Sequence, residues 1–186
     1  MVELTDEEII SKVQEGDAHA FGFIVERYEG KMMRYARKFL ANGQDAQDIV
    51  QDAFLKAYEN IQSFDRSKRF SPWLYRIAHN EFVSAIRKKK RGPMMLFNAD
   101  TFFPQLVSKD RTDSAFEEKE LRIALNTSLN ELNVKYREPL ILYYMEELSY
   151  KEIADVLQIP ISTVGIRIKR GKGMLKKIYQ KKGYDI

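Results

Sequence analysis

The sequence of 186 residues contains no cysteine. Without thiols, the chain cannot form disulfides, cysteine-based zinc sites, iron–sulfur clusters or a thiol nucleophile, and a reducing cytoplasm is the expected location. Its only histidines, His19 and His79, are far apart and show no HExxH spacing. No recognisable acid–base pair stands out among the carboxylates. We therefore expect no cofactor, no metal, no small-molecule substrate and no enzymatic activity.

Long apolar runs are also missing. The longest, residues 140–145, is far below the roughly 20 residues that a membrane helix needs. The N-terminus carries Glu3, Asp6, Glu7 and Glu8, whereas a signal peptide begins with basic residues. The sequence thus predicts a protein that neither spans a membrane nor is exported.

Glycine and proline are scarce, with 9 and 5 residues, and apolar residues recur at helical spacing along most of the chain. No segment shows the alternation typical of a β-strand. The predicted fold class is all-α: two small helical domains joined by an irregular linker, the second a four-helix domain with a helix-turn-helix.

The net charge of +4 hides an uneven distribution. Residues 1–30 hold eight acids and two bases, while residues 167–182 hold eight bases and no acid. A second basic block occupies residues 87–91. Two cationic surfaces of this kind favour a nucleic acid as partner, although either run alone is also typical of a solvated helix face.

The first domain is predicted to span residues 1–91. Thr5 and Glu8 suggest a capping box, and helical spacing continues past Gly16 and Asp17 as far as residue 40. A second helix is expected over residues 45–61. Ser71 and Pro72 resemble an N-cap followed by proline at the first helical position, opening a helix to about residue 91.

Residues 92–115 lack periodicity and are predicted to be the linker, which leaves residues 116–186 for the second domain. There, Ser149 and Glu152 form a capping box before a short helix. Residues 158–160 make a tight break, and a last helix is expected over residues 161–179. A short amphipathic helix, a turn and a basic helix together indicate a helix-turn-helix.

In the last helix, Ile161, Val164 and Ile168 are expected to face inward, and Gly171 to allow close packing. The outward side would hold residues suited to base edges and phosphates in a major groove: Ser162, Thr163, Ile166, Arg167, Lys169 and Arg170. An ordinary basic surface helix is the alternative interpretation.

The helix that begins at Pro72 carries a polar stripe opposite its apolar face, made of Arg76, Asn80, Ser84, Arg87 and Arg91. The loop before it contains Phe64 and Phe70 among charged residues, an arrangement suited to stacking on exposed bases. The alternative is that these rings and Trp73 anchor the loop to the core.

The helix over residues 45–61 carries a different outer face, formed by Asp48, Gln51, Asp52 and Leu55. It is acidic to neutral with one exposed apolar residue. Such a face fits a protein partner better than a phosphate, and a plain solvated face is the alternative.

Three segments in order resemble the extracytoplasmic-function sigma factors, group 4 of the sigma-70 family. Residues 45–54 (DAQDIVQDAF) look like that family's core-polymerase-binding helix, residues 70–80 (FSPWLYRIAHN) like its minus-10 helix, and residues 148–171 like its minus-35 helix-turn-helix. The resemblance covers nearly the whole chain. This chain departs from the family at position 165, where it has glycine and the family commonly has lysine.

The resemblance implies a sigma factor that binds core RNA polymerase, at the beta-prime clamp and the beta flap, and directs promoter-specific initiation. Asp48, Gln51, Asp52 and Leu55 would contact the polymerase, and the outward residues of the last helix would read the minus-35 element. The minus-10 element and melted strand would meet Phe64, Arg66, Lys68, Arg76, Asn80, Ser84, Arg87 and Lys88. An anti-sigma factor, often in the membrane, usually regulates such proteins.

A helix-turn-helix activator or repressor that binds operator DNA without core polymerase is the remaining alternative. Such a protein would bind its duplex unaided, usually as a dimer on paired half-sites. A sigma factor must bind core polymerase and open the promoter.

Overall fold

A computed structural model describes residues 4–40, 42–90 and 123–184 of the chain. They form two compact units, one that contains residues 4–90 and another that contains most of residues 123–184. All regular structure in the described residues is helical, which confirms the predicted fold class. The predicted linker, residues 92–115, lies outside the described residues, as do the domain boundaries at residues 91 and 116.

The first unit begins with α1 (Asp6–Gln14). The predicted capping box is present: the Glu8 amide donates to Thr5 Oγ1 at 3.2 Å and the Thr5 amide donates to Glu8 Oε2 at 2.8 Å. The helix does not continue through Gly16 as predicted. Gly16 has a φ of +109°, which a helix cannot accommodate, and a 3-10 turn, η1 (Ala18–Ala20), follows.

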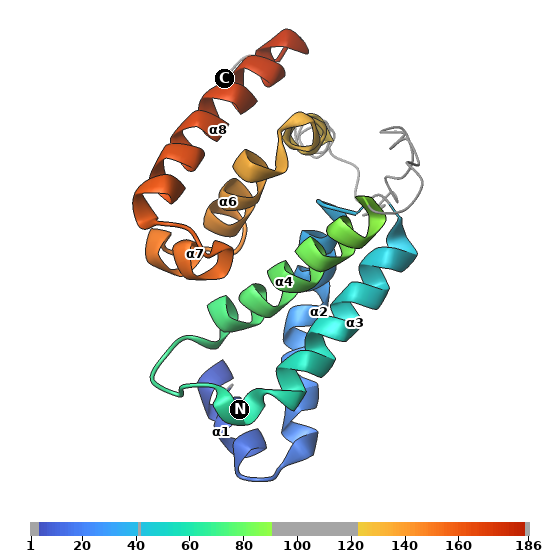
Figure 1. The fold of residues 1–186 in the computed structure, drawn as a ribbon, viewed down its shortest axis with the longest axis vertical. Helices are drawn as coiled ribbons and strands as arrows, with labels where there is room; N and C mark the ends of the chain where they lie inside the picture. Colours follow the sequence, from blue (N-terminus) through green and yellow to red (C-terminus); the bar gives the residue numbers. More distant parts are fainter. Residues whose placement is uncertain (1–3, 41, 91–122, 185–186) are drawn as a thin grey trace, which may run out of the picture. The chain divides into compact units, whose positions relative to one another are not determined.

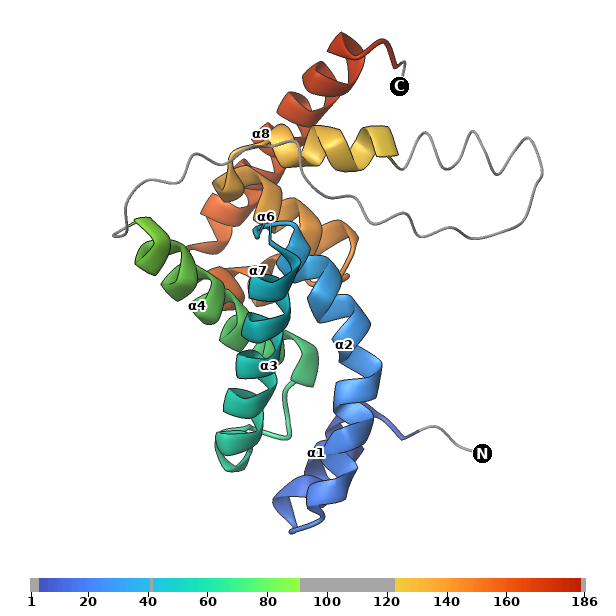
Figure 2. The ribbon, with the colours of Figure 1, turned by 90° about the vertical axis from the view of Figure 1, so that its right-hand side faces the viewer.

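Helices α2 (Phe21–Arg37), α3 (Gly43–Glu59) and α4 (Phe70–Lys90) form the body of the first unit, with the 3-10 turn η2 (Ile61–Ser63) after α3. Figures 1 and 2 show α2 and α3 side by side, with α1 against one end of α2. Tyr35 of α2 centres an aromatic core, with its ring 5.3 Å from Tyr75 and 5.2 Å from Phe82. These edge-to-face contacts join α2 to α4.

Helix α4 starts earlier than the sequence suggested. Ser71 and Pro72 lie inside its first turn, so Ser71 is not the N-cap. The amide of Phe70 donates instead to Glu7 Oε1 of α1, at 2.9 Å. A carboxylate 63 positions away therefore caps α4, a contact that local sequence cannot reveal.

The second unit contains a helical segment over residues 123–131, then α6 (Val134–Tyr144), α7 (Tyr150–Leu157) and α8 (Ile161–Lys181). Gly171 lets α8 approach α6, as predicted: a Cβ at this position would lie 2.9 Å from Leu140 Cδ1. Glu147 and Gln158 adopt positive φ angles of 55° and 53° where α6 and α7 end. These left-handed residues provide the turns on either side of α7.

Candidate functional site

The outward face of α8 holds the residues that the helical spacing placed there. Val164 and Ile168 are buried, whereas Ile166 is 52% exposed. Ser162, Lys169 and Arg170 are exposed and Thr163 and Arg167 half-buried. The prediction that Ile161 faces inward is wrong. Its side chain is 51% exposed, because it lies on the first turn of α8, and it does not join the buried stripe.

Helix α7 and its turn orient this face. The predicted capping box is formed, with the Glu152 amide donating to Ser149 Oγ at 3.3 Å and the Ser149 amide donating to Glu152 Oε2 at 2.7 Å. The left-handed Gln158 then reverses the chain, and Pro160 precedes α8. A Cβ at Gly165 would touch the Tyr150 ring at 3.5 Å, an ordinary contact. The glycine at this position is therefore not required by packing.

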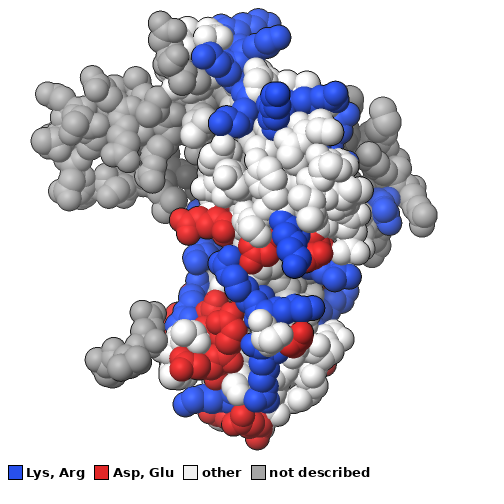
Figure 3. Space-filling view, turned by 90° about the vertical axis from the view of Figure 1, so that its left-hand side faces the viewer, with Lys and Arg blue, Asp and Glu red and all other residues white. Residues whose placement is uncertain are grey.

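Tyrosines of α6 hold two of the cations on α8. Desolvation raises the pKa of Tyr136, but the hydrogen bond from Arg170 and the charges of Lys135 and Arg170 outweigh it and lower the pKa. A hydrogen bond to Tyr144 raises the pKa of Lys172. Lys and Arg side chains gather around the C-terminal part of α8, whereas acidic and basic side chains are interleaved over the first unit (Figure 3). The α8 surface thus combines a basic field with positioned cations.

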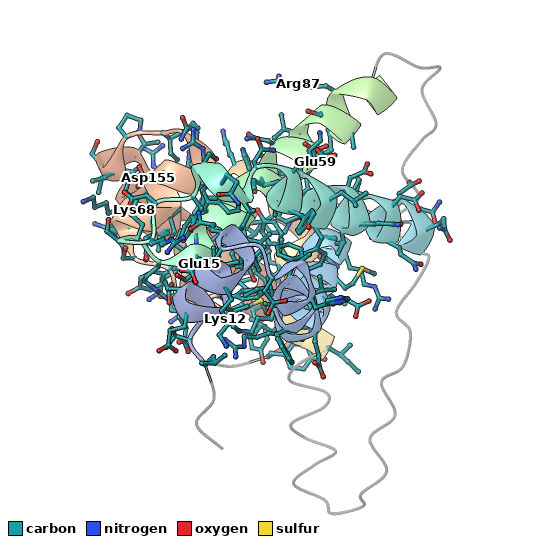
Figure 4. All side chains as sticks on the ribbon, turned by 90° about the horizontal axis from the view of Figure 1, so that it is seen from below. Lys12, Glu15, Glu59, Lys68, Arg87 and Asp155 are labelled. Carbon is teal, nitrogen blue, oxygen red and sulfur yellow. The ribbon has the colours of Figure 1, made fainter. Side chains whose placement is uncertain are left out.

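The predicted polar stripe runs along the exposed side of α4. Arg76, Asn80, Ser84 and Arg87 are all exposed, opposite the buried Leu74, Ala78 and Phe82. Arg87 projects from α4 near its far end (Figure 4). The side chain of Lys88 and the whole of Arg91 lie outside the described residues.

Phe64 is not available for stacking on a base, which corrects the sequence prediction. Its side chain is only 5% exposed, and its ring lies 5.5 Å from that of Phe70 and 5.3 Å from that of Trp73. The alternative interpretation was the right one for these rings: they anchor the loop. Burial of a phenylalanine side chain is worth about 1.5–3 kcal/mol, which favours the core position.

The loop cations differ in their surroundings. Arg66 donates to Ser11 Oγ at 2.7 Å and to Glu15 Oε1 at 3.1 Å, and also to Gln14 Oε1. It is therefore held by α1, although its side chain stays exposed. Lys68 is exposed, with Nζ 3.7 Å from Asp65 Oδ2. Hydrogen bonds from Ser67 lower the pKa of Asp65.

A cavity of about 450 Å³ opens between α1, α2 and this loop. Its cationic lining comes from two elements: Arg27 and Lys31 of α2, and Arg66, Lys68 and Arg69 of the loop. Sequence reasoning missed the α2 pair. Their spacing of four residues places them on one face of a helix, but only the fold brings that face to the loop.

The acids of this cavity are engaged. Asp6 accepts hydrogen bonds from Tyr28 and Arg27, and Glu7 caps α4. Burial, and then the hydrogen bond to Asp6, raise the pKa of Tyr28 far above its usual value. Five cations and two acids therefore line the cavity, and Arg27, Arg66 and Lys68 are paired with carboxylates.

The residues of the predicted protein-binding face on α3 are all exposed. Asp48, Gln51 and Asp52 point outward, and Leu55 is 53% exposed. Gln44 donates to Asp48 Oδ1 at 3.0 Å, which fixes that carboxylate one turn from the start of the helix. The face presents one apolar side chain among acceptors.

In the described ranges, no three histidine, aspartate or glutamate side chains gather closely enough to hold a metal ion. Nor does any described helix combine the length and apolar character needed to cross a membrane.

Comparisons with known proteins match both units. Residues 24–92 match the family model Sigma-70 region 2, and residues 122–175 match Sigma-70, region 4. The ECF RNA polymerase sigma factor SigW of Bacillus subtilis is 39% identical over 176 residues, which cover 90% of this chain and 93% of that protein. The ECF RNA polymerase sigma-E factor of Escherichia coli K12 is 32% identical over 176 residues, 91% of this chain and 92% of its own.

A solved structure of CnrH in complex with the cytosolic domain of CnrY resembles the fold, with a TM-score of 0.68 at 25% identity, covering 95% of this chain and 97% of that one. The two matched regions occur in the order in which the minus-10-like and helix-turn-helix segments occur here. The chain belongs to the extracytoplasmic-function sigma factors of the sigma-70 family.

Proposed function

We propose that this protein binds core RNA polymerase and directs it to promoters through three separate surfaces on α3, α4 and α8. The observation that carries the proposal is the exposure of all three polar faces on helices whose opposite sides are buried. The α3 face, with Leu55 exposed among acceptors, suits the protein partner that a sigma factor requires.

The α8 surface would read the minus-35 element. Arg167 and Arg170 can donate in pairs to guanine or clamp a phosphate, and Ile166 can contact a thymine methyl. Ser162 and Thr163, at the N-terminal end of α8, suit phosphate or base-edge hydrogen bonds, and Lys169 adds charge.

The α4 stripe would meet the minus-10 element. Arg76, Arg87 and Lys88 supply charge for the backbone, while Asn80 can hydrogen-bond to an unpaired base. Lys68, exposed on the loop, would add a phosphate contact. With Phe64 buried, the loop would hold a base through polar and backbone groups.

Opening of the promoter needs no catalytic group on this chain. Unpairing and flipping a base costs a few kcal/mol, which binding of the displaced strand can offset. RNA synthesis belongs to the polymerase, so the sigma factor itself is non-enzymatic. Two weak readers on one chain also gain affinity through effective concentration.

The α3 face would dock on the beta-prime clamp, and the second unit would contact the beta flap. An anti-sigma factor would regulate the protein by covering the α3 face. CnrH has been solved with the cytosolic domain of CnrY bound, which supports a regulator of this kind. We place the protein in the cytoplasm, held at the membrane only through such a regulator.

Transcription with purified core polymerase on a mixed genomic template, with and without this protein, tests the proposal. New start sites that share a two-part upstream element are expected. No new starts, together with no binding to core, would favour a free helix-turn-helix regulator instead.

Two variants test the division of labour. Asp52→Arg should weaken core binding about tenfold or more, because it reverses the charge at the docking face. Glu29→Arg, a charge reversal on an exposed part of α2, should leave core binding unchanged.

Arg167→Ala should reduce minus-35 recognition by about 1–3 kcal/mol and leave core binding intact. Lys177→Ala on the same helix is its matched control.

Asn80→Ala should assemble into holoenzyme normally and form open complexes poorly, as measured by permanganate reactivity of the melted strand. Unaltered open-complex formation would remove Asn80 from the base-holding role.

A further inference from the structure

We propose that Gln14 of α1 is a positioning residue for promoter opening, because it holds the loop between α3 and α4 in its DNA-binding conformation. The inference rests on the proposed function of that loop. Helix α1 precedes residue 24, where the match to the region 2 family model begins, so this role is separate from the DNA-facing residues of α4.

The carboxamide of Gln14 joins two points of the loop. Its Nε2 donates to the carbonyl oxygen of Ile61 at 2.7 Å and to that of Phe64 at 3.0 Å. Both contacts are partly buried and span 47 and 50 positions of the chain. One amide group therefore ties both ends of the turn that leads from α3 into the loop.

The other end of the carboxamide fixes the loop farther along. Gln14 Oε1 accepts a hydrogen bond from Arg66 Nε, and Arg66 also donates to Ser11 and Glu15 on the same side of α1. In return, Gln62 Nε2 donates to the Gln14 carbonyl oxygen at 3.2 Å. Figure 4 labels Lys12 of α1 and Glu15, which directly follows the helix.

These contacts set the path of the loop rather than the fold of the unit. The apolar anchors Phe64 and Phe70 are buried, and their rings pack against each other and against Trp73. Between them, residues 65–69 are all exposed, so no core packing defines their backbone. A loop that must hold an unpaired base gains affinity when it is ordered before binding.

The test uses the full chain reconstituted with core polymerase and a fluorescent single-stranded oligonucleotide that carries the minus-10 element of a mapped promoter. Gln14→Met removes both donors and the acceptor at nearly the same length. Three hydrogen bonds of the carboxamide are lost, and we expect the less ordered loop to bind the oligonucleotide about tenfold more weakly. Affinity for core polymerase and minus-35 binding should stay within about twofold, and Lys12→Met, on the exposed side of α1, should change neither.

Amide hydrogen exchange of the free protein gives a readout that does not depend on polymerase. In Gln14→Met, exchange should accelerate in residues 61–69 and stay unchanged in the buried parts of α3 and α4. In a double-mutant cycle, Arg66→Ala should cost less on top of Gln14→Met than it costs alone, since the two side chains act together.

Each possible outcome either supports or contradicts the positioning role of Gln14. If wild-type protein binds the oligonucleotide in holoenzyme and Gln14→Met binds equally well, or if loop exchange is unaltered, the positioning role is wrong while the proposed function stands. If core binding falls together with oligonucleotide binding, Gln14 is merely structural. If the wild type fails to bind core or oligonucleotide, the proposed function fails, and the positioning role fails with it.

Discussion

Two glycines of α8 stand two positions apart in opposite surroundings. A Cβ at Gly171 would lie 2.9 Å from Leu140 Cδ1 and 3.2 Å from the Tyr136 carbonyl oxygen, whereas a Cβ at Gly173 would meet nothing within 4 Å. The substitution to alanine is the same at both sites, so the pair separates helix propensity from packing.

We expect Gly171→Ala to lower the free energy of unfolding of the second unit by about 1–3 kcal/mol, because the backbone oxygen of Tyr136 cannot move away cheaply. Gly173→Ala should raise it by about 0.5–1 kcal/mol through helix propensity. Urea unfolding followed by circular dichroism measures both. Equal stabilisation by the two variants would contradict the close α6–α8 contact.

Tyr28 gives a prediction about pH. Burial and the hydrogen bond to Asp6 raise its pKa in the folded state above the ordinary value of 10.0. In the unfolded chain the phenol ionises near pH 10, so the folded state binds more protons there and its stability falls as pH rises. The stabilisation from this group is complete below pH 10.

Wild-type protein should therefore exceed Tyr28→Phe in stability at pH 8, and the difference should narrow by pH 11. Urea unfolding of both proteins at a series of pH values measures this difference. A constant difference over that range would show that Tyr28 is not held protonated by its surroundings.

Helix α7 depends strongly on its cap, because it has only eight residues and short helices are marginal. Ser149→Ala removes the side-chain half of the capping box and should cost the second unit about 1 kcal/mol. Since α7 supports the turn into α8, minus-35 binding should weaken as well.

Thr5→Ala is the matched control, because α1 carries the same type of capping box in the first unit. It should cost a similar free energy there and leave minus-35 binding unchanged. Loss of minus-35 binding in both variants would mean that the effect does not arise at α7.

The sequence predicted which segments are helical, but it did not predict several of the residues at which the helices begin or end. The apolar spacing over residues 45–61 and 72–91 predicted helices with one polar outer face each, because a helix places positions three and four apart on one side. The break at Gly16 and the early start of α4 at Phe70 were missed. The first depends on a positive φ and the second on a cap from Glu7.

Across the whole molecule, each unit has its own core. Leu74 is fully buried in the first unit and Leu140 nearly so in the second. Leu→Ala in a core costs about 2–5 kcal/mol. We expect Leu74→Ala to lower the melting temperature of one calorimetric transition and Leu140→Ala that of another. A single transition shifted by both would show that the units unfold together.

The sequence alone determined the helical class, the helix-turn-helix and the outward faces of α3, α4 and α8. These properties arise from spacing within one helix or from caps three residues apart, so they are local. The resemblance to the family could also be recognised from sequence, because each of its three segments is a short continuous stretch of the chain.

Only the tertiary structure determined the contacts of the loop between α3 and α4. It buried Phe64 against Phe70 and Trp73, paired Arg66 with α1, and brought Arg27 and Lys31 to the same cavity. The contacts between α1 and the loop span 47 to 55 positions of the chain. No local pattern encodes them, because they exist only once α1 has packed against η2 and the start of α4.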